Sequence, residues 1–277
     1  MFSSNRKKKF LGLVTRCKDE YFVKEFCDYY LSQGVDQIVI VDDDSNDKSI
    51  YNELKRYENI EIDFQKNIIE TEYIGKIYPS LKKRFHWLIY VDVDEFITTK
   101  RNSHLTIREE LENTFESVDC IKVPWVMMSS NNLDKSPSSI LLSNIYRWDH
   151  DKRHPHDIHK FRCRYDEIEV KCIFKTKSFV QIRDHHPVAR FKGRLNIVES
   201  VNAQTTELDP WYHSLREKDI SSGYLLCYHY RIISKENSNY KLVNNYWYKK
   251  HGYTLDDLMS CDYSERVDMT LAEKVSG

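Results

Sequence analysis

The sequence predicts an α/β fold with a mainly parallel sheet flanked by helices. Strand-like and helix-like segments alternate over roughly the first 95 residues, as the crossover connections between parallel strands require. Polar clusters directly follow several of the apolar strand segments, at the positions where open α/β sheets bind ligands. The 277 residues suffice for one large domain with additions or for two small domains.

Apolar runs and helical spacing predict the individual elements. We expect Asp19 to cap the first helix and Gly34 to end it. Pro79 should kink or split the helix that contains it, and Thr106 should cap the helix that follows. The expected strands are 10–14, 37–41, 60–64, 87–91, 121–128, 140–147, 168–174 and 179–183, and the expected helices follow Asp19, Ser45 and Thr106, cover 70–84 and fill the aromatic end from residue 239.

Composition excludes several classes of protein. The net charge of −1 argues against a nucleic-acid partner, because neutralising phosphates requires an excess of Lys and Arg. The seven cysteines lack a CxxC pair and are expected to be free thiols, which indicates the reducing cytoplasm. The basic start of the chain is followed by an apolar run too short for a signal peptide or a membrane span. Peripheral attraction to an anionic membrane is the most that this segment indicates.

Three acidic or mixed clusters follow the first, second and fourth predicted strands, at 15–20, 42–45 and 92–95. We expect them to converge on one crevice at the carboxyl edge of the sheet. No glycine-rich phosphate loop occurs at any of them, so a bound diphosphate would need another source of positive charge. Asp92 and Asp94 share one face of an extended segment and offer the hard oxygen ligands of Mg²⁺ or Mn²⁺. The alternative is a strand end whose acids simply face water.

Four segments carry a resemblance to a known group of enzymes. They are LVTRCKDE at 13–20, IVIVDDDSND at 38–47, WLIYVDVDEF at 87–96, and His229-Tyr230-Arg231 with Ser234 and Lys241. Together they resemble glycosyltransferases of the GT-A fold, above all the family 2-like and family 92-like (DUF23-type) groups. The third segment resembles the family's W…DxDEF motif and the fourth its HYR…S…K element. In the second, Asp44 stands where the family commonly has Gly.

The resemblance implies a GT-A (Rossmann-like) fold with a helical C-terminal extension. Residues 1–238 would be the glycosyltransferase domain, with a nucleotide half at 10–100 and an acceptor half at 101–238. Residues 239–277 would be the extension, whose aromatic residues are expected to pack on the core, with a sugar-stacking platform as the alternative.

The resemblance also implies roles for individual residues. Thr15, Arg16 and Asp42 or Asp43 would bind the nucleotide of a nucleotide-sugar donor, most simply a UDP-sugar. Asp92 would lie near the ribose and the metal, and Asp94 would bind Mn²⁺ or Mg²⁺. Glu95 is expected instead to hold the strand end through hydrogen bonds.

An inverting transfer also needs a general base, and the acceptor would be a hydroxyl of a glycan, a lipid-linked sugar or a protein. Asp134 and Asp157 are the candidates for that base. His186 and His229 compete to complete the metal shell, and for each the alternative is a buried histidine bonded to backbone. The histidines of DHDKRHPHDIHK, at 149–160, could form a zinc site, but without a Cys pair or an HExxH helix they indicate an acceptor-side loop.

Two further classes of function stay open. One is a phosphate-handling enzyme, either a sugar nucleotidyltransferase or a phosphatase built on the acidic pair. The missing glycine-rich loop argues against the first, and Phe96, at the Thr position of DxDxT, argues against the second. The other class is a nucleotide-binding module without catalysis.

Overall fold

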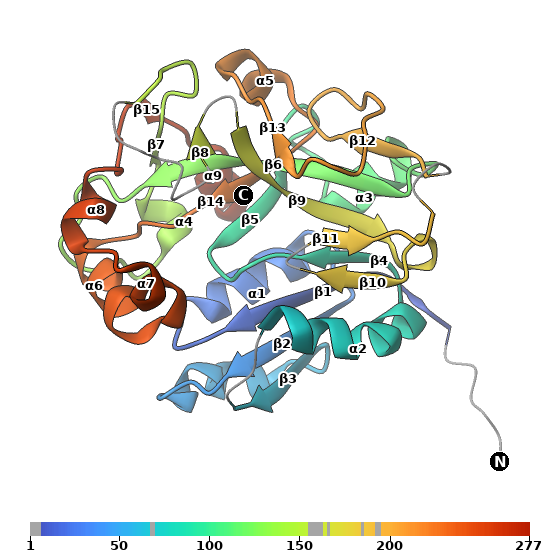
Figure 1. The fold of residues 1–277 in the computed structure, drawn as a ribbon, viewed down its shortest axis with the longest axis horizontal. Coiled ribbons are helices and arrows are strands. Elements are labelled where there is room, and N and C mark those ends of the chain that lie inside the picture. Colours follow the sequence, from blue (N-terminus) through green and yellow to red (C-terminus); the bar gives the residue numbers. More distant parts are fainter. Residues whose placement is uncertain (1–6, 67–69, 155–162, 165–166, 184–185, 192–194) are drawn as a thin grey trace.

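The computed structural model describes residues 7–66, 70–154, 163–164, 167–183, 186–191 and 195–277 (Figure 1). Thirteen of the described strands form one sheet with the core order β15-β7-β6-β9-β4-β1-β2-β3. These strands are β1 (Lys9–Cys17), β2 (Gln37–Asp43), β3 (Ile60–Gln65), β4 (Phe85–Tyr90), β5 (Glu95–Thr99), β6 (Cys120–Ser129), β7 (Tyr146–Arg147), β8 (Cys163–Arg164), β9 (Glu167–Lys175), β12 (Ile197–Glu199), β13 (Tyr212–His213), β14 (Leu225–His229) and β15 (Arg266–Val267).

Helices cover this sheet, and a short antiparallel hairpin lies beside it. The hairpin consists of β10 (Gln181–Arg183) and β11 (His186–Val188). The helices are α1 (Val23–Ser32), α2 (Glu70–Arg84), α3 (Ile107–Asn113), α4 (Ile140–Ser143), α5 (Glu217–Ser222), α6 (Lys235–Asn244), α7 (Tyr246–His251), α8 (Leu255–Met259) and α9 (Thr270–Ser276), with 3₁₀ turns at η1 (Lys48–Arg56) and η3 (Thr176–Ser178).

β1, β2 and β4 are buried along most of their length, which explains why they read as continuous apolar runs, whereas β3 at the edge of the sheet is only partly buried. Leu13 of β1 packs in one core cluster with residues of α1 and η1, and the adjacent Val14 packs in a second cluster with residues of α2. Helices therefore cover both faces of β1 (Figure 1). Gly12 leaves room for Phe85, since a Cβ at this position would lie 2.4 Å from that ring.

The predicted α/β class is confirmed. β1, β2, β3 and β4 run parallel, and β9 then pairs antiparallel with β4 and β6. The chain leaves β1 for β2 and β3 on one side and returns to β4 on the other side. This reversal is the topological switch point at which α/β sheets bind ligands.

Several local predictions are confirmed and others are wrong. Gly34 has φ 85° just beyond α1, and Thr106 forms a capping box with Glu109. Asp19 does not cap α1; its carboxylate instead accepts hydrogen bonds from Asn46 and the Asp47 N–H. α2 continues through Pro79 without being split.

The segment 140–147 is not one strand. Its first part forms α4, because the Ser139 hydroxyl accepts the Leu142 N–H and caps a helical turn. Only Tyr146 and Arg147 are extended. The sequence also gave no signal for β5 and β14, which pair antiparallel with each other.

The C-terminal part is helical, as predicted. α6, α7 and α8 pack side by side at the left edge of Figure 1. The division predicted at residue 238 falls inside α6, and β15 returns to pair with β7 of the main sheet.

None of the helices in the described part is long and apolar enough to cross a membrane. Six cysteines have a described side chain, and all six are free and buried: Cys17, Cys27, Cys120, Cys172, Cys227 and Cys261.

Candidate active site

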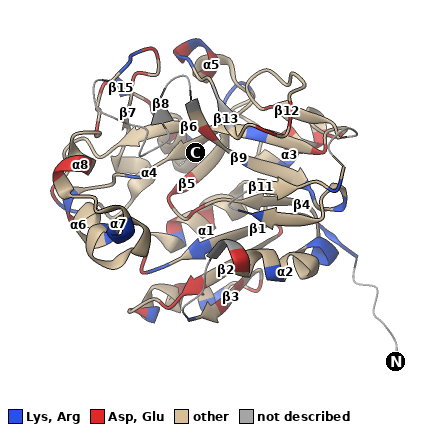
Figure 2. Cartoon of the chain, viewed as in Figure 1, with Lys and Arg blue, Asp and Glu red and all other residues tan. Residues whose placement is uncertain are grey.

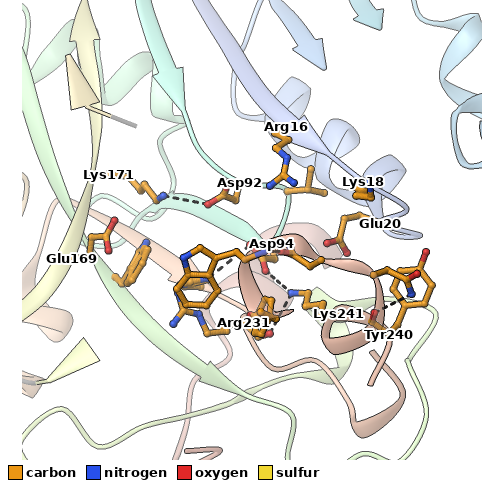
Figure 3. Close-up of a pocket in the computed structure, with 17 residues that line it drawn as sticks. Arg16, Lys18, Glu20, Asp92, Asp94, Glu169, Lys171, Arg231, Tyr240 and Lys241 are labelled. Carbon is orange, nitrogen blue, oxygen red and sulfur yellow. Dashed lines mark hydrogen bonds and ion pairs between the residues drawn. The ribbon is translucent and has the colours of Figure 1, made fainter. Parts of the chain in front are cut away.

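A cavity of ≈ 290 Å³ lies beyond the carboxyl ends of β1 and β4, at the switch point of the sheet (Figure 3). Residues after β1 and after β4 form one side, and residues of β6, β9, β14, α6 and α7 complete it. The lining residues are Arg16, Lys18, Glu20, Asp92, Val93, Asp94, Trp125, Glu169, Lys171, His229, Arg231, Tyr240, Lys241, Asn244, Asn245, Trp247 and Tyr248.

The acidic turn after β4 is held together by Glu95 and a buried lysine. Glu95 is fully buried, and its Oε2 accepts the Asp92 N–H at 2.8 Å, which agrees with the role predicted for it. Lys171 of β9 places its Nζ 3.2 Å from Glu95 Oε1 and 3.3 Å from Asp92 Oδ2. Burial opposes the charge of Lys171, but these two carboxylates outweigh it and raise the lysine pKa above its ordinary value.

Asp94 has a lysine and a histidine as neighbours. Lys241 Nζ donates to Asp94 Oδ2 at 2.7 Å and to the Arg231 carbonyl at 3.2 Å. Burial alone would lower the pKa of Lys241, but the charges of Asp94 and Glu20 hold it above its ordinary value. His229 Nε2 lies 3.7 Å from Asp94 Oδ1.

The pairing of β5 with β14 explains how these distant residues meet. β14 runs antiparallel to β5, with His229 opposite Glu95, and the Tyr230 N–H donates to the Asp94 carbonyl at 2.8 Å. Ser234 then caps α6 by accepting the Asn237 N–H, and α6 brings Lys241 back to Asp94. The W…DxDEF and HYR…S…K segments are therefore parts of one site.

The residues predicted to bind the nucleotide take different positions. Arg16 lines the cavity and bonds to Asp43 Oδ2 at 2.8 and 3.2 Å. Thr15 is buried, and its hydroxyl donates to the Arg16 carbonyl. Asp42 is also buried; it accepts the Tyr51 hydroxyl at 2.7 Å and the Ser45 N–H at 3.3 Å. Arg16 is the member of this group that lines the cavity, and Asp42 holds the turn after β2.

Glu20 faces the cavity beside Asp94 and Lys18 (Figure 3). Within the described part of the chain its carboxylate makes neither a hydrogen bond nor an ion pair, whereas Asp92 and Asp94 each pair with a lysine. Burial raises the pKa of Glu20 to about 7; Lys241 opposes the shift and Asp94 adds to it. This carboxyl group can therefore accept or release a proton near neutral pH.

Of the two acids predicted as general base, Asp134 does not line this cavity. Asp134 has an 81% exposed side chain and pairs with Lys235 at 2.7 Å. Asp157 lies outside the described residues, as do His156 and His159 of the histidine-rich segment. His150 accepts the Met127 N–H at 3.2 Å, and His154 pairs with Glu265 at 2.7 Å.

The two competing histidines are also separated. His186 stacks on Trp211, with ring centres 4.0 Å apart, and its Nε2 lies 2.9 Å from the Val170 carbonyl. It does not line the cavity. His229 does line the cavity, next to Asp94. Burial, together with the nearby charges of Arg231 and Lys171, lowers the pKa of His229 well below its ordinary value, so the ring is neutral.

The cavity carries a local excess of positive charge. Its lining includes five cationic and four acidic side chains, although the whole chain has a net charge of −1. Over the rest of the described structure, acidic and basic residues are interspersed (Figure 2). The cations of the cavity are Arg16, Lys18, Lys171, Arg231 and Lys241, and the acids are Glu20, Asp92, Asp94 and Glu169.

A comparison with protein families identifies the family of this chain. Residues 18–269 match the model of glycosyltransferase family 92. The chain belongs to glycosyltransferase family 92. The predicted resemblance to this family is thereby confirmed.

Two solved structures show a limited similarity to this chain. A structure of S. aureus TarS in complex with UDP-GlcNAc is 13% identical, with a TM-score of 0.34, over 61% of this chain and 46% of that chain. The mannosyltransferase PcManGT from Pyrobaculum calidifontis, in complex with GDP-Man and Mn²⁺, is 11% identical, with a TM-score of 0.31, over 62% and 46%. The family 92 chain thus spans just under half of the length of either solved chain, and the TarS chain comprises residues 1–349 of that protein. No curated protein matches its sequence.

The residues beside Asp94 suit a divalent cation of the Mg²⁺ or Mn²⁺ type. Among the residues that the structure describes, no three or more His, Cys, Asp or Glu side chains lie together so that they could hold a metal ion by themselves. Such cations instead take one or two carboxylates and complete their shell with water and substrate phosphates. Asp94 supplies one such carboxylate through Oδ1, the neutral His229 Nε2 lies 3.7 Å from it as a nitrogen donor, and the carboxylate of Asp92 faces the same cavity. The donor set fits the ion, although Asp94 Oδ2 is bonded to Lys241.

Sequence reasoning assigned no role to Glu20, Lys171 or Trp125 of this site. Lys171 had a signal: it interrupts the apolar strand 168–174 with a charge, and a buried lysine requires an acidic partner. Glu20 stood inside the first polar cluster, but only the packing of α6 over that cluster distinguishes it from Asp19.

Proposed function

We propose that the family 92 chain transfers a hexose from a nucleotide-sugar donor, a UDP-sugar, to a hydroxyl group of a glycan, lipid-linked or protein acceptor. The transfer is a single displacement with inversion at the anomeric carbon. The supporting observation is the cavity at the switch point, where the acidic pair Asp92 and Asp94 lies among five cationic side chains. A nucleoside diphosphate leaving group needs this combination of positive charge and metal-binding oxygen.

Arg16, Lys18 and Arg231 are placed to attract and orient the diphosphate. Arg16 lies at the end of β1, where its bonds to Asp43 fix the guanidinium. Charged donors held in advance stabilise negative charge that develops on a leaving group, because they need no reorganisation during the reaction. Arg231 stands over the Trp125 ring, with its guanidinium carbon 5.5 Å from the ring centre.

Mn²⁺ or Mg²⁺ belongs to this proposal, with Asp94 and His229 as its protein ligands and Asp92 beside it. When bound, the cation would act as a Lewis acid toward the diphosphate. Lys171 keeps the Asp92 carboxylate and the Glu95 side chain in place. Lys241 orients Asp94 through Oδ2 and leaves Oδ1 facing His229.

Glu20 is our candidate for the general base. The acceptor oxygen forms a bond to the anomeric carbon while the bond from that carbon to the phosphate oxygen breaks. The nucleoside diphosphate leaves with the bond electrons, and the acceptor hydroxyl proton passes to Glu20. Its unpaired carboxylate and its pKa of about 7 suit this task near neutral pH.

A cytoplasmic location, with at most peripheral membrane contact, is also part of the proposal. It is supported by the six cysteines whose side chains are described, which are buried free thiols, since disulfides form mainly in oxidising compartments.

Turnover of nucleotide sugars tests the proposal. Purified chain is incubated with UDP-hexoses and UDP-N-acetylhexosamines, with and without Mn²⁺, and released UDP is measured. We expect slow Mn²⁺-dependent release of UDP, which Asp94→Asn abolishes. The matched control is Asp256→Asn, at an exposed carboxylate of α8 outside the cavity, and it should behave as wild type. The absence of UDP release from every donor would overturn the proposal.

A further inference from the structure

Aromatic side chains at the outer edge of the cavity are exposed, although the sequence favoured packing for the aromatic end. Tyr240 is 39% exposed, Trp247 38% and Tyr246 73%. Tyr240 and Trp247 line the cavity, and Tyr246 immediately precedes Trp247 on α7. We call these three residues the aromatic rim. Exposed aromatic rings next to a polar cavity characterise surfaces that bind ligands with one apolar face.

Three neighbouring rings contact the Trp247 ring. Its centre lies 4.6 Å from the His251 ring, 5.2 Å from the Tyr253 ring and 5.2 Å from the Tyr248 ring, and both of those tyrosines are buried. Asn245 caps α7 by accepting the Trp247 N–H at 2.9 Å, which fixes the backbone under the ring. A pre-positioned ring loses little conformational entropy on binding a ligand.

Polar groups accompany the rings. Asn244 and Asn245 line the cavity beside Trp247, and the Arg231 guanidinium carbon lies 5.8 Å from the centre of the Trp247 ring. A sugar ring has a C–H face that can lie against an aromatic ring and equatorial hydroxyls that need hydrogen-bond partners at its edge. The rim and its neighbours supply both.

Apart from Arg231, the charged side chains suited to a diphosphate come from other elements than the rim. Trp247 and Tyr240 come from α7 and α6, whereas Arg16, Lys18, Asp92 and Asp94 come from the ends of β1 and β4. All of them face one continuous cavity. The rim and the strand-end charges therefore line different parts of the same cavity.

We propose that the aromatic rim is the acceptor subsite of the family 92 chain and that it binds a sugar ring of a glycan acceptor. This proposal rests on the proposed function and narrows its acceptor to carbohydrate. Trp247 stacks on the C–H face of the acceptor sugar, and Asn244 and Asn245 bond to its hydroxyls. The acceptor hydroxyl then points toward Glu20, which faces the same cavity.

Direct binding tests the subsite without turnover. The probes are the methyl α- and β-glycosides of glucose, galactose, mannose and N-acetylglucosamine, at millimolar concentration. Saturation-transfer NMR measures their binding to the full chain in the presence of UDP and Mn²⁺. We expect at least one glycoside to bind. Trp247→Ala should weaken its binding at least tenfold, and Trp247→Phe, which keeps a ring, less than threefold.

The control is Phe191→Ala, at a 71% exposed aromatic residue outside the rim, and it should bind the glycoside as wild type does. Binding of none of the eight glycosides, or equal weakening by the Ala and Phe variants, would overturn the subsite. So would Trp247-dependent binding to phosphatidylcholine–phosphatidylglycerol vesicles without glycoside binding, which would make the rim a membrane contact. UDP binding is measured in the same samples by calorimetry, so failure of the proposed function is seen separately from failure of the subsite.

Discussion

Replacement of Glu20 by Gln should stabilise the fold at alkaline pH while it abolishes sugar transfer. Glu20 has an ordinary pKa of 4.5 that rises to about 7 in the folded chain. Between these two values the folded state binds more protons than the unfolded state does, so the free energy of unfolding falls as pH rises. Above about pH 7 the folded chain carries the full cost of the ionised group.

The structure sets the size of this effect. A pKa difference from 4.5 to about 7 corresponds to about 3 kcal/mol, at about 1.4 kcal/mol for each pH unit. The Glu20 carboxylate faces a cavity that admits water, and solvent screening reduces the cost. We therefore expect Glu20→Gln to raise the free energy of unfolding at pH 8 by about 1–2 kcal/mol, with a smaller gain at pH 5.

Urea unfolding at pH 5 and pH 8 measures the effect. The matched control is Glu58→Gln, at an exposed position between η1 and β3, which should change the free energy of unfolding by less than about 0.5 kcal/mol at either pH. The reasoning is refuted if Glu20→Gln is no more stable than wild type at pH 8, or if its gain does not grow between pH 5 and pH 8.

Three further predictions follow from the same contacts. Lys171→Met leaves Glu95 buried without its cation and should lower the free energy of unfolding by about 3–5 kcal/mol; adding Glu95→Gln should recover part of that loss, and purely additive effects in urea unfolding would contradict the pairing. Gly12→Ala places a methyl group 2.4 Å from the Phe85 ring and should cost about 1–3 kcal/mol, a prediction that an unchanged Tm would refute. The kcat/KM of wild type should increase as pH is raised past about 7, because Glu20 loses its proton there. A plot of kcat/KM against pH that shows no increase near pH 7 would exclude Glu20 as the base.

The N-terminal half could be predicted because its elements are locally encoded. Continuous apolar runs define β1, β2 and β4, and Thr106 with Glu109 makes a complete helix start in a few residues. The segment 140–147 was mispredicted because short apolar runs suit a helix as well as a strand, and the Ser139 cap decided in favour of the helix.

The partners within the site could not be predicted, because they come from tertiary contacts. Asp92 and Asp94 were visible as a pair in the sequence. Their lysines, however, come from β9 and α6, which lie about 80 and 150 residues further along the chain. The pairing of β5 with β14 and the packing of α6 bring these groups together, and no local pattern encodes either contact.

The most direct test of the account is the affinity of the cavity for UDP in the presence of Mn²⁺, measured by calorimetry for wild type and for Asp94→Asn. Asn retains an oxygen that can accept a hydrogen bond from Lys241, so circular dichroism should show the fold intact. The account predicts Mn²⁺-dependent binding that Asp94→Asn weakens at least tenfold. UDP binding of equal strength in wild type and Asp94→Asn would contradict the account. So would UDP binding whose strength is the same with and without Mn²⁺.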